Sequence, residues 1–592
     1  MLDKQLLNDC FFWFETNKVD NNNHRSLYFN DPVDVLILTD PDKKEQFFSQ
    51  LEEASGKYWL AGFFGYEMGY LFEKKFKYCD EADFPYALFG VYKEPEIFDH
   101  RKNKSVPEKM GSNDYQVSNL RLNTSKSEYI DNIGILKEHI SRGDIYQANY
   151  TIKYKFNFEG SAYGLYNDLK SRQAVAYNVF AGLGDSYIIS ISPELFFCKD
   201  KEHMEVKPMK GTLKRGRTSA EDERNREFLA NDIKNKSENI MIVDLLRNDL
   251  AKISQYGSVK AEKLFEVEKY NTLFQMTSTI ESRVKSNVII YELIRSVFPS
   301  GSVTGAPKIR SMEIIRDLEK EKRNIYTGSI GFFQPDGSAE FNVAIRTILI
   351  NKDKGEMGIG GGIVYDSAAE DEFDECRLKA RFLTYDLADG FKLIETMLYD
   401  RGYGNIGLHV ERLKSSSEYF DYKFNENDIL DGLNSIESGL GSEKYKVRLT
   451  LDKKGEVNVT AEKINSEEKD YKIIISDKKT DSEDISLYHK TTNRELYNCE
   501  LKKAREKGYF DTIYLNEKNE ITEGSITNVY IKKGDVFYTP PIECGLLNGV
   551  MRQIVIKEYS IKEKIITKEE LINADEVYIS NSIEGFSRAE LV

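Results

Sequence analysis

Lys210 stands in the stretch PMKGT, between a proline and a glycine. Proline fixes the backbone angle φ, and glycine permits a close approach of the backbone, so the stretch predicts a tight turn. A lysine on such a turn has two interpretations. It is either a solvated surface charge or a nucleophile at the floor of a pocket, and the second role requires a neutral amine.

Carboxylates on two expected helices suggest a second kind of chemistry. Glu372, Glu375 and Lys379 are spaced i, i+3 and i+7, so they share one helix face. Glu238 stands just before an apolar run on another expected helix, KNKSENIMIVDLLRND. Magnesium is usually bound by one or two protein carboxylates together with waters and substrate oxygens, so one carboxylate from each helix could form such a site. The spacing alone favours the alternative, a solvated charged face.

Three further segments place polar residues at turns. Gln147 in RGDIYQANYT is expected between a helix and a strand, and Glu194 in SISPELFF at a strand edge. The Gly-rich stretch GSVTGAPK, residues 301–308, is expected to lead into a helix whose first turn holds Pro307. Free N–H groups at such a helix start bind anions.

The elements that position these residues follow from the hydrophobic pattern. Residues 1–98 indicate aromatic-rich strands and one helix, DKKEQFFSQLEEAS, and the polar stretch 101–127 indicates a loop or a boundary. An amphipathic helix that starts at a serine is expected at SKSEYIDNIGILKEHISRGD. Further helices are expected over 221–252, 307–322 and 368–385, and strands over 326–334, 339–350 and 356–365.

A second set of candidate residues follows a boundary that we place near the glycine at 387–390. Lys490 lies in YHKTTNRELYN, Glu523 in ITEGS and Arg412 in HVERL, while Val550 and Met551 begin an expected helix in NGVMRQ. Taken singly, each is more typical of surface decoration or a turn. The predicted divisions are 1–124, 125–387 and 388–592.

Length, charge and cysteine usage limit the class of protein. A chain of 592 residues is too long for one core. Its net charge of −15 argues against a nucleic-acid surface and for a cytoplasmic protein. The six scattered cysteines are typical of reduced thiols. The sequence has no apolar run near the roughly 20 residues that span a bilayer, and its start is unlike a signal peptide, so we expect no membrane segment.

In their order, eight motifs resemble those of the chorismate-utilising enzymes: GDIYQAN, SPE, KGT, SENIMIVDLLRNDL, GSVTGAPK, YTGSIGF, AIRT and GGGIVYDS. The resemblance covers residues 125–385, and 1–124 is similar to the family's weaker N-terminal lobe. It implies an α+β domain with a β-sandwich and helices. A lysine in P-x-KGT resembles aminodeoxychorismate synthase component I, in which this lysine attacks C2 of the ring, the 4-hydroxyl leaves and ammonia enters at C4.

The same resemblance implies roles for other residues. Glu194 matches the general acid that helps the hydroxyl leave, and Glu238 and Glu375 match the magnesium ligands. Gln275 stands where the family often has histidine, which leaves one substrate contact open. The matched substrate-binding positions are Gln147, Thr304, Tyr326, Arg346, Gly360, Gly361, Gly362 and Lys379.

Residues 388–592 resemble the class IV, fold-type IV pyridoxal-phosphate enzymes, which are aminotransferases and aminodeoxychorismate lyase. Lys490 matches their Schiff-base lysine, Glu523 the carboxylate that pairs with the pyridine nitrogen, and Arg412 the phosphate-binding arginine. The backbone N–H groups of Val550 and Met551 match a phosphate site at a helix start. Aminotransferases often have threonine where Met551 stands, which favours a lyase.

Together the resemblances imply that chorismate is aminated to 4-amino-4-deoxychorismate, which loses pyruvate to give 4-aminobenzoate for folate synthesis. The implied cofactors are magnesium and pyridoxal phosphate. Because the sequence has no recognisable glutaminase motif, we expect ammonia from a separate glutamine amidotransferase subunit. The resemblance allows a homodimer through the C-terminal domain. The alternatives are an anthranilate-synthase-like or other chorismate enzyme fused to an amino-acid aminotransferase, and a non-catalytic scaffold for the amidotransferase.

Overall fold

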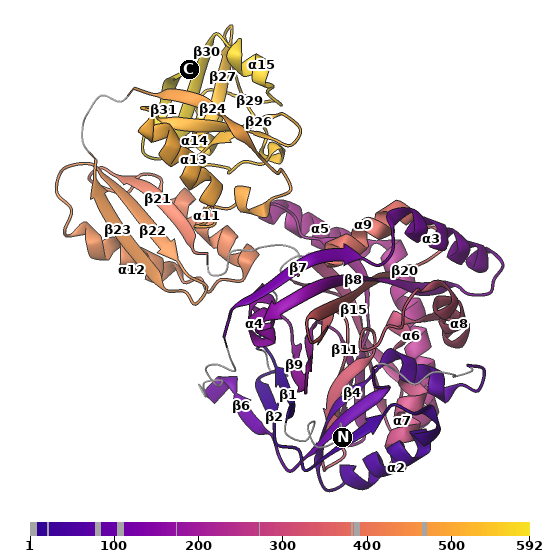
Figure 1. Ribbon diagram of the computed structural model, residues 1–592. Helices are drawn as coiled ribbons and strands as arrows, with labels where there is room; N and C mark the ends of the chain where they lie inside the picture. Colours follow the sequence, from indigo (N-terminus) through magenta and orange to yellow (C-terminus); the bar gives the residue numbers. More distant parts are fainter. Residues whose placement is uncertain are drawn as a thin grey trace. The chain divides into compact units, whose positions relative to one another are not determined.

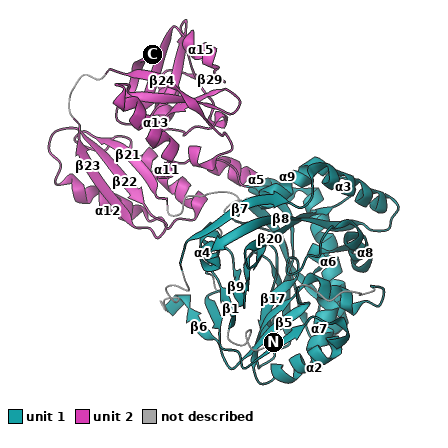
Figure 2. Cartoon of the chain, in the orientation of Figure 1, with its two compact units in different colours: residues 1–214, 226–387 teal, residues 215–225, 388–592 magenta. Residues whose placement is uncertain are grey.

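The computed structural model describes residues 9–592 except 20–22, 77–83, 103–111, 173, 271–272, 381–382, 384–390 and 465–469. The chain forms two compact units (Figure 1 and Figure 2). Unit 1 comprises Met1–Lys214 and Arg226–Leu387, and unit 2 comprises Arg215–Asn225 and Ala388–Val592. The predicted boundary at 387/388 lies outside the described residues.

Unit 1 is built on two antiparallel sheets. The first sheet has the order β16 (Gly305–Ala306), β8 (Gln147–Gly160), β20 (Lys354–Ile363), β19 (Thr347–Asn351), β10 (Ser186–Ser192), β9 (Tyr177–Leu183), β1 (Cys10–Glu15), β2 (Arg25–Phe29) and β6 (Glu96–Asp99), with β7 (Tyr115–Leu122) paired to β8. The second has the order β13 (Met209–Lys214), β15 (Leu273–Arg283), β12 (His203–Lys207), β11 (Leu195–Asp200), β18 (Ala339–Val343), β17 (Ser329–Phe333), β4 (Trp59–Phe64), β5 (Ala87–Tyr92) and β3 (Asp34–Leu38), with β14 (Lys260–Lys269) paired to β15.

The sheets are held face to face by aromatic side chains. Phe12 and Phe29 from the first sheet and Phe63 and Phe332 from the second belong to one buried cluster. Burial of so much aromatic surface is the main favourable contribution to this packing. The α+β sandwich with helices that the sequence predicted is therefore confirmed.

Helices extend the two cores outward from the sandwich. The cluster that includes the second sheet's Phe89 and Phe341 also takes in residues of α2 (Lys44–Ser55), α6 (Ile233–Ile253) and α7 (Ile290–Val297). The cluster that includes the first sheet's Ile152 takes in residues of α3 (Lys126–Ser141), α4 (Ala162–Arg172), α8 (Lys308–Leu318) and α9 (Ala369–Lys379). Each of these two cores therefore combines residues of one sheet with residues of the helices packed on it.

Several predicted elements need correction. The expected helix over 221–252 is two helices, α5 (Ser219–Asn231) and α6, because Asp232 lies between them and its side chain caps Asn235 N–H. The expected strand over 339–350 is interrupted between β18 and β19, where Arg346 has a φ of 50°. The polar stretch 101–127, expected to be a loop or a boundary, contains β7.

Unit 2 contains a small sheet and a larger one. The small sheet has the order β21 (Leu393–Tyr399), β22 (Tyr445–Leu451) and β23 (Val457–Lys463), with α11 (Ile406–Phe420) and α12 (Glu426–Glu437) packed on it. The larger sheet has the order β26 (Ile521–Gly524), β25 (Asp511–Asn516), β24 (Lys472–Thr480), β31 (Gly585–Leu591), β30 (Glu576–Asn581), β27 (Asn528–Lys533), β28 (Val536–Thr539) and β29 (Lys562–Glu563). Because β26 also pairs with β27, part of this sheet closes on itself. Helices α13 (Glu495–Glu506), α14 (Val550–Glu558) and α15 (Lys568–Ile572) complete the unit.

Two general expectations can be compared with the described residues. Cys10, Cys198, Cys376, Cys499 and Cys544 are free thiols, and Cys79 lies outside the described residues. Among the helices that the structure describes, none is both long and apolar enough to cross a membrane.

Arg323 ties together three segments of unit 1 that are distant in sequence. Its guanidinium makes two hydrogen bonds to the Glu319 carboxylate, of 2.7 and 2.9 Å. It also donates to the carbonyl oxygens of Val303 and Asn149. The side chain is 2% exposed, so these contacts replace its hydration almost completely. Arg323 thus fixes the start of β8 against the stretch GSVTGAPK.

We predict that Arg323→Met lowers the free energy of unfolding of unit 1 by about 3–5 kcal/mol, because Glu319 would remain buried without its cation. Both tryptophans, Trp13 and Trp59, lie in unit 1, so tryptophan fluorescence during urea unfolding measures this unit. Arg316→Met, on α8, is the control, because the Arg316 side chain is 43% exposed. Equal effects of the two substitutions would contradict the structural role of Arg323.

Candidate active sites

A cavity of about 320 Å³ in unit 1 gathers residues from every motif that sequence analysis selected in this part of the chain. Its walls come from β13, α6, β20 and α9 and from the segments around residues 194, 302, 326 and 346. Of the predicted site residues, it is lined by Glu194, Lys210, Glu238, Tyr326, Arg346, Gly360, Gly362, Glu375 and Lys379.

Lys210 lies on strand β13, so the predicted turn is wrong. The register between β13 and β15 is irregular from Met209 to Thr212, which places one extra residue on the β13 side. Gly211 has a φ of 93°, a conformation that glycine adopts at little cost, so its place beside Lys210 has a backbone reason. An irregularity of this kind re-aims a side chain at the edge of a sheet. It is consistent with Lys210 lining the cavity rather than lying on the surface.

Glu194 is buried close to this lysine. Ser302 donates a hydrogen bond of 2.7 Å to its carboxylate. Burial raises the pKa of Glu194 to about 7, although the bond from Ser302 and the charge of Lys210 act in the opposite direction. A carboxyl group with this pKa can both donate and accept a proton near neutral pH. Ser302 was missed by sequence analysis, although it lies inside the GSVTGAPK motif.

The carboxylates proposed for a metal ion are already paired with lysines. Glu238 lies 3.7 Å from the Lys210 amine, and Glu375 lies 2.8 Å from the Lys379 amine. The charge of Lys379 lowers the pKa of Glu375 despite burial. Glu372 accepts a hydrogen bond from Ser367, and burial raises its pKa. Three carboxylates from α6 and α9 line one cavity, and carboxylate oxygens are ligands that magnesium takes.

Arg346 lines the cavity and Gln147 does not, but both have polar atoms without a hydrogen-bond partner among the described residues. Gln147 is fully buried, and neither its amide oxygen nor its amide nitrogen has a hydrogen-bond partner among the described residues. Arg346 Nη1 is likewise unpartnered within that part of the chain, and burial lowers the pKa of Arg346 to about 10. Buried groups of this kind are costly unless something satisfies them. They fit a bound polar ligand that includes an anionic group.

The glycines of β20 allow other residues to approach closely. A Cβ atom on Gly362 would lie 2.0 Å from the Lys210 amine and 2.7 Å from Gln147 Nε2, so these three residues meet at one point. Lys379 donates to the Gly360 carbonyl oxygen over 3.0 Å. Gly361 does not line the cavity; its Cβ direction faces Glu372 instead.

Tyr326 and Thr304 differ in their surroundings. Tyr326 lines the cavity, and burial raises the pKa of its hydroxyl. A Cβ atom on Gly358 would lie 2.0 Å from its ring, so the tyrosine packs on that glycine. Thr304 is fully buried outside the cavity lining, and its hydroxyl donates to the Ser300 carbonyl oxygen over 3.0 Å. The structure therefore gives Thr304 a local partner in the turn.

Gln275, which departs from the family pattern, holds the backbone beside the lysine. Its amide nitrogen donates to the Gly211 carbonyl oxygen over 3.1 Å, and its amide oxygen accepts from the Thr212 hydroxyl over 3.1 Å. Gln275 also lines the cavity. The structure thus gives the residue a role that does not require contact with a ligand.

The second candidate site, in unit 2, surrounds Lys490. Burial and the charges of Arg412 and Arg494 lower the pKa of Lys490 to about 7. Arg412, on α11, makes two hydrogen bonds to Glu395, of 2.6 and 2.9 Å. His409 makes a third bond of 2.6 Å to the same carboxylate. Burial alone would raise the pKa of Glu395, but these partners hold it at about 2. Sequence analysis missed Glu395, although a lone acid in the apolar strand LIETMLY was a usable signal.

Glu523 and the start of α14 complete this group. The Glu523 carboxylate accepts hydrogen bonds from Tyr497, Asn528 and the Leu547 backbone, while burial raises its pKa to about 8. Val550 and Met551 begin α14, as predicted, and the N–H groups of a first helical turn have no intrahelical acceptor.

Arg494 is a further cation beside Lys490 that sequence analysis did not select. It donates to the Ser525 carbonyl oxygen, and its Nε has no partner among the described residues. A buried amine, a buried carboxylate, arginines and a helix start form a donor set that suits a phosphate-bearing carbonyl cofactor.

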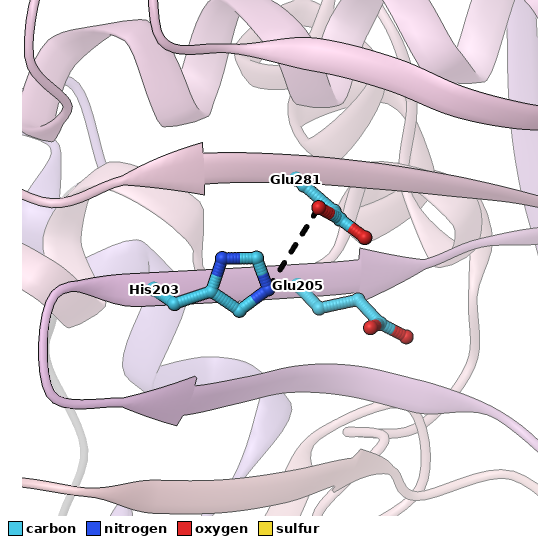
Figure 3. Close-up of side chains that lie close together, drawn as sticks. All are labelled: His203, Glu205 and Glu281. Atoms are coloured by element: carbon cyan, nitrogen blue, oxygen red, sulfur yellow. Dashed lines mark ion pairs between the residues drawn. The ribbon is translucent and has the colours of Figure 1, made fainter.

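A third group of ionisable side chains lies on the second sheet of unit 1. His203 and Glu205 lie on β12 and Glu281 on the neighbouring strand β15, and the His203 ring pairs with Glu281 over 3.9 Å (Figure 3). Their potential metal-binding atoms lie within 4.8 Å of one another. His203 is exposed and the two glutamates are half-buried, so water solvates these charges, and the arrangement alone does not indicate a bound ion.

The parts of the chain that hold the two candidate sites match two different protein families. Residues 9–385 match the chorismate binding enzyme family, and the chain belongs to this family. Residues 392–591 match amino-transferase class IV.

Individual relatives are more specific. The chain is 31% identical over 379 residues to aminodeoxychorismate synthase component 1 of Escherichia coli (strain K12), a match that covers 60% of this chain and 83% of that protein. It is 41% identical over 261 residues to the chloroplastic aminodeoxychorismate synthase of Arabidopsis thaliana, covering 43% of this chain and only 28% of that protein. A solved anthranilate synthase component I from Streptococcus pneumoniae TIGR4 is 25% identical with a TM-score of 0.55, covering 62% of this chain and 93% of that one.

We predict that Lys490 in the cofactor-free chain reacts with an amine-directed reagent at an unusually low pH. Only the neutral amine reacts, so its labelling should rise through about pH 7, whereas an ordinary lysine requires about pH 10. Labelling would be measured by peptide mass spectrometry, with exposed Lys502 as the internal control. The same pH dependence for both lysines would contradict the electrostatics described here.

Proposed function

We propose that the chain aminates chorismate to 4-amino-4-deoxychorismate and then removes pyruvate to give 4-aminobenzoate, a folate precursor. The observation that carries the first activity is the presence of Lys210 and Glu194 in one cavity, where the pKa of Glu194 is about 7. In the sequence families that this chain resembles, a lysine at this position attacks the ring. The names of the relatives from Escherichia coli and Arabidopsis thaliana support the same assignment.

The two activities are divided along the chain. Residues 125–387 would hold the chorismate site, residues 1–124 would supply the strands that complete its sandwich, and residues 388–592 would carry the lyase site. The strand pairing of β1 with β9 and of β4 with β17 supports a structural role for the first segment.

The first reaction needs a nucleophile and an acid on one substrate. The Lys210 nitrogen forms a bond to C2 of the ring, and the bond from C4 to its hydroxyl breaks. Glu194 donates the proton with which the hydroxyl leaves as water. Ammonia then bonds to C4, the Lys210 nitrogen leaves C2, and the excess protons pass to solvent.

The cavity offers cations for the substrate and carboxylates for a metal ion. Arg346 and Lys379 would bind the two carboxylates of chorismate, with Tyr326, Gln147 and the amides of Gly360 and Gly362 beside them. Glu238 and Glu375 would hold magnesium, which would offset charge on a ring carboxylate.

In the second reaction Lys490 would act as the cofactor lysine and as the base. Pyridoxal phosphate, when bound, supplies an electron sink for the bonds broken at the substrate. Arg412 and the N–H groups of Val550 and Met551 would bind its phosphate, and Glu523 would pair with its ring nitrogen. Lys490 would take the proton from C4 of the aminated ring, because an amine with a pKa near 7 is available in its neutral form at neutral pH.

Ammonia is proposed to come from a separate glutamine amidotransferase subunit, because several relatives are named as component 1. The main alternative is anthranilate formation, since relatives that share this fold are named anthranilate synthase. Lys210 favours amination at C4 over that alternative. Supplying chorismate, magnesium and ammonium and identifying the product by mass spectrometry decides between them.

We predict that Lys210→Ala slows amination of chorismate by at least about a thousandfold, because the covalent step loses its nucleophile. Pyruvate release from supplied 4-amino-4-deoxychorismate should be unchanged, since Lys210 belongs to unit 1. Lys214→Ala, at the exposed end of the same strand, is the control. Amination at the wild-type rate by the Lys210 variant would exclude the nucleophile role.

We predict that Lys490→Ala, supplied with chorismate and ammonium, accumulates 4-amino-4-deoxychorismate and forms little 4-aminobenzoate. The variant loses both the lysine that holds the cofactor and the base, so its visible absorbance band should also disappear after dialysis. Lys502→Ala on the surface of α13 is the matched control. Wild-type yields of pyruvate from the Lys490 variant would show that this lysine or this second activity is wrongly assigned.

A further inference from the structure

Residues 215–225 belong to unit 2, although they lie within the sequence of the chorismate-binding part (Figure 2). They follow directly after β13, the strand that carries Lys210, and include the first turns of α5. Unit 2 therefore consists of two stretches of the chain that are separated by more than a hundred residues. We call the shorter stretch, Arg215–Asn225, the crossing segment. It contacts residues that in turn contact the stretch holding Lys490.

Arg215 anchors the crossing segment within unit 2. Its side chain is 1% exposed and makes two hydrogen bonds of 2.7 Å to Asp222. The guanidinium lies over the ring of Tyr419, 4.2 Å from the centroid, and donates to the Tyr419 carbonyl oxygen over 3.1 Å. The Tyr419 hydroxyl in turn donates to the Gly216 carbonyl oxygen over 2.7 Å. A buried charge with this many partners fixes Tyr419 by both its ring and its backbone.

Tyr419 connects this anchor to the candidate cofactor lysine. Its ring lies 4.4 Å from the ring of His489, the residue that precedes Lys490. Ser416, one turn earlier on α11, makes a hydrogen bond of 3.0 Å with His489 Nδ1. Burial and the charge of Arg215 keep His489 neutral by lowering its pKa to about 3. The contact series Arg215–Tyr419–His489 therefore ends at the backbone of Lys490.

The crossing segment has further contacts on the same side of unit 2. The Arg217 guanidinium lies 5.6 Å from the ring centroid of Tyr488 and 3.6 Å from Glu483. The Ser219 hydroxyl lies 2.7 Å from that of Ser415 on α11. Because α11 also carries Arg412, the segment contacts both the helix of the candidate phosphate-binding arginine and the stretch that holds Lys490.

We propose that Arg215 is a positioning residue for Lys490, acting through Tyr419 and His489, and that the crossing segment completes the cofactor-binding half of the chain. This inference rests on the proposed role of Lys490 as the pyridoxal-phosphate lysine. It makes the second activity depend on residues encoded in the first part of the sequence, without any contact between Arg215 and the cofactor.

The test uses the full chain with Arg215→Met and, as a matched control, Arg224→Met, an exposed arginine of the same segment. The dissociation constant for pyridoxal phosphate would be measured from the visible absorbance band. We expect Arg215→Met to weaken binding by about tenfold, equivalent to about 1.4 kcal/mol, and Arg224→Met to leave it unchanged. Tryptophan fluorescence, which reports unit 1, should be the same in all three proteins.

A second measurement separates positioning from loss of folded protein. The pH dependence of Lys490 labelling in the cofactor-free chain should move up by about half a unit in Arg215→Met, as the amine gains access to water. Equal cofactor affinity and equal labelling in the wild type and Arg215→Met would overturn the proposal.

If Arg215→Met fails to fold, Tyr419→Phe decides, because it keeps the ring and removes only the bond to Gly216. Weaker cofactor binding by about threefold or more in this variant supports the proposal, and unchanged binding overturns it. A wild-type chain that forms no visible band would overturn the proposed function and this inference together. A band that is equal in the wild type and the Arg215 and Tyr419 variants overturns the inference alone.

Discussion

Charge that is removed from water must be neutralised by a partner or by a ligand, and both sites of this protein are arranged around that constraint. In unit 1, Arg323 and Glu319 neutralise each other and fix the backbone next to the cavity, whereas Arg346 retains an unpartnered nitrogen among the described residues. In unit 2, the Glu395 carboxylate is paired with Arg412 and hydrogen-bonded to His409. The nitrogens of Arg346 and Arg494 that are unpartnered in the described part of the chain are groups that an anionic ligand can satisfy.

The residue types predicted for the first site could be read from the sequence, because a lysine nucleophile, an acid and paired glutamates are recognisable by motif. Nine of the predicted residues do line one cavity. Their backbone setting was harder to predict. Arg346 has a positive φ, which interrupts a stretch whose alternating apolar residues indicate one continuous strand. At Lys210, the proline and glycine that predicted a turn lie instead at a strand with an irregular register. The spacing of apolar residues predicts which face of an element is buried, but it does not predict local changes of strand register.

Residues that act on other site residues were the ones that sequence analysis missed. Ser302 and Arg494 lie inside quoted motifs and Glu395 lies in none, but each acts on another site residue, through a hydrogen bond or through its charge. Their positions depend on long-range packing: Ser302 lies more than a hundred residues from Glu194. A buried acid inside an apolar strand, as in LIETMLY, is the one local signal of this kind, since its burial requires a nearby cation.

The crossing segment changes how the fusion of two families should be understood. Two independent modules joined by a linker would share only the linker, and their stabilities would be separate. Here the chain enters unit 2 directly after β13, the strand of Lys210, and returns to unit 1 within α5. The folding of β13 and α5 is therefore covalently linked to the folding of the crossing segment, which contacts Tyr419 and His489. The bonds of Arg215 are made to Asp222 on one side and to Tyr419 on the other, which ties the fold of the segment to its docking. Sequence that lies within the match to the chorismate binding enzyme family therefore contributes structure to unit 2.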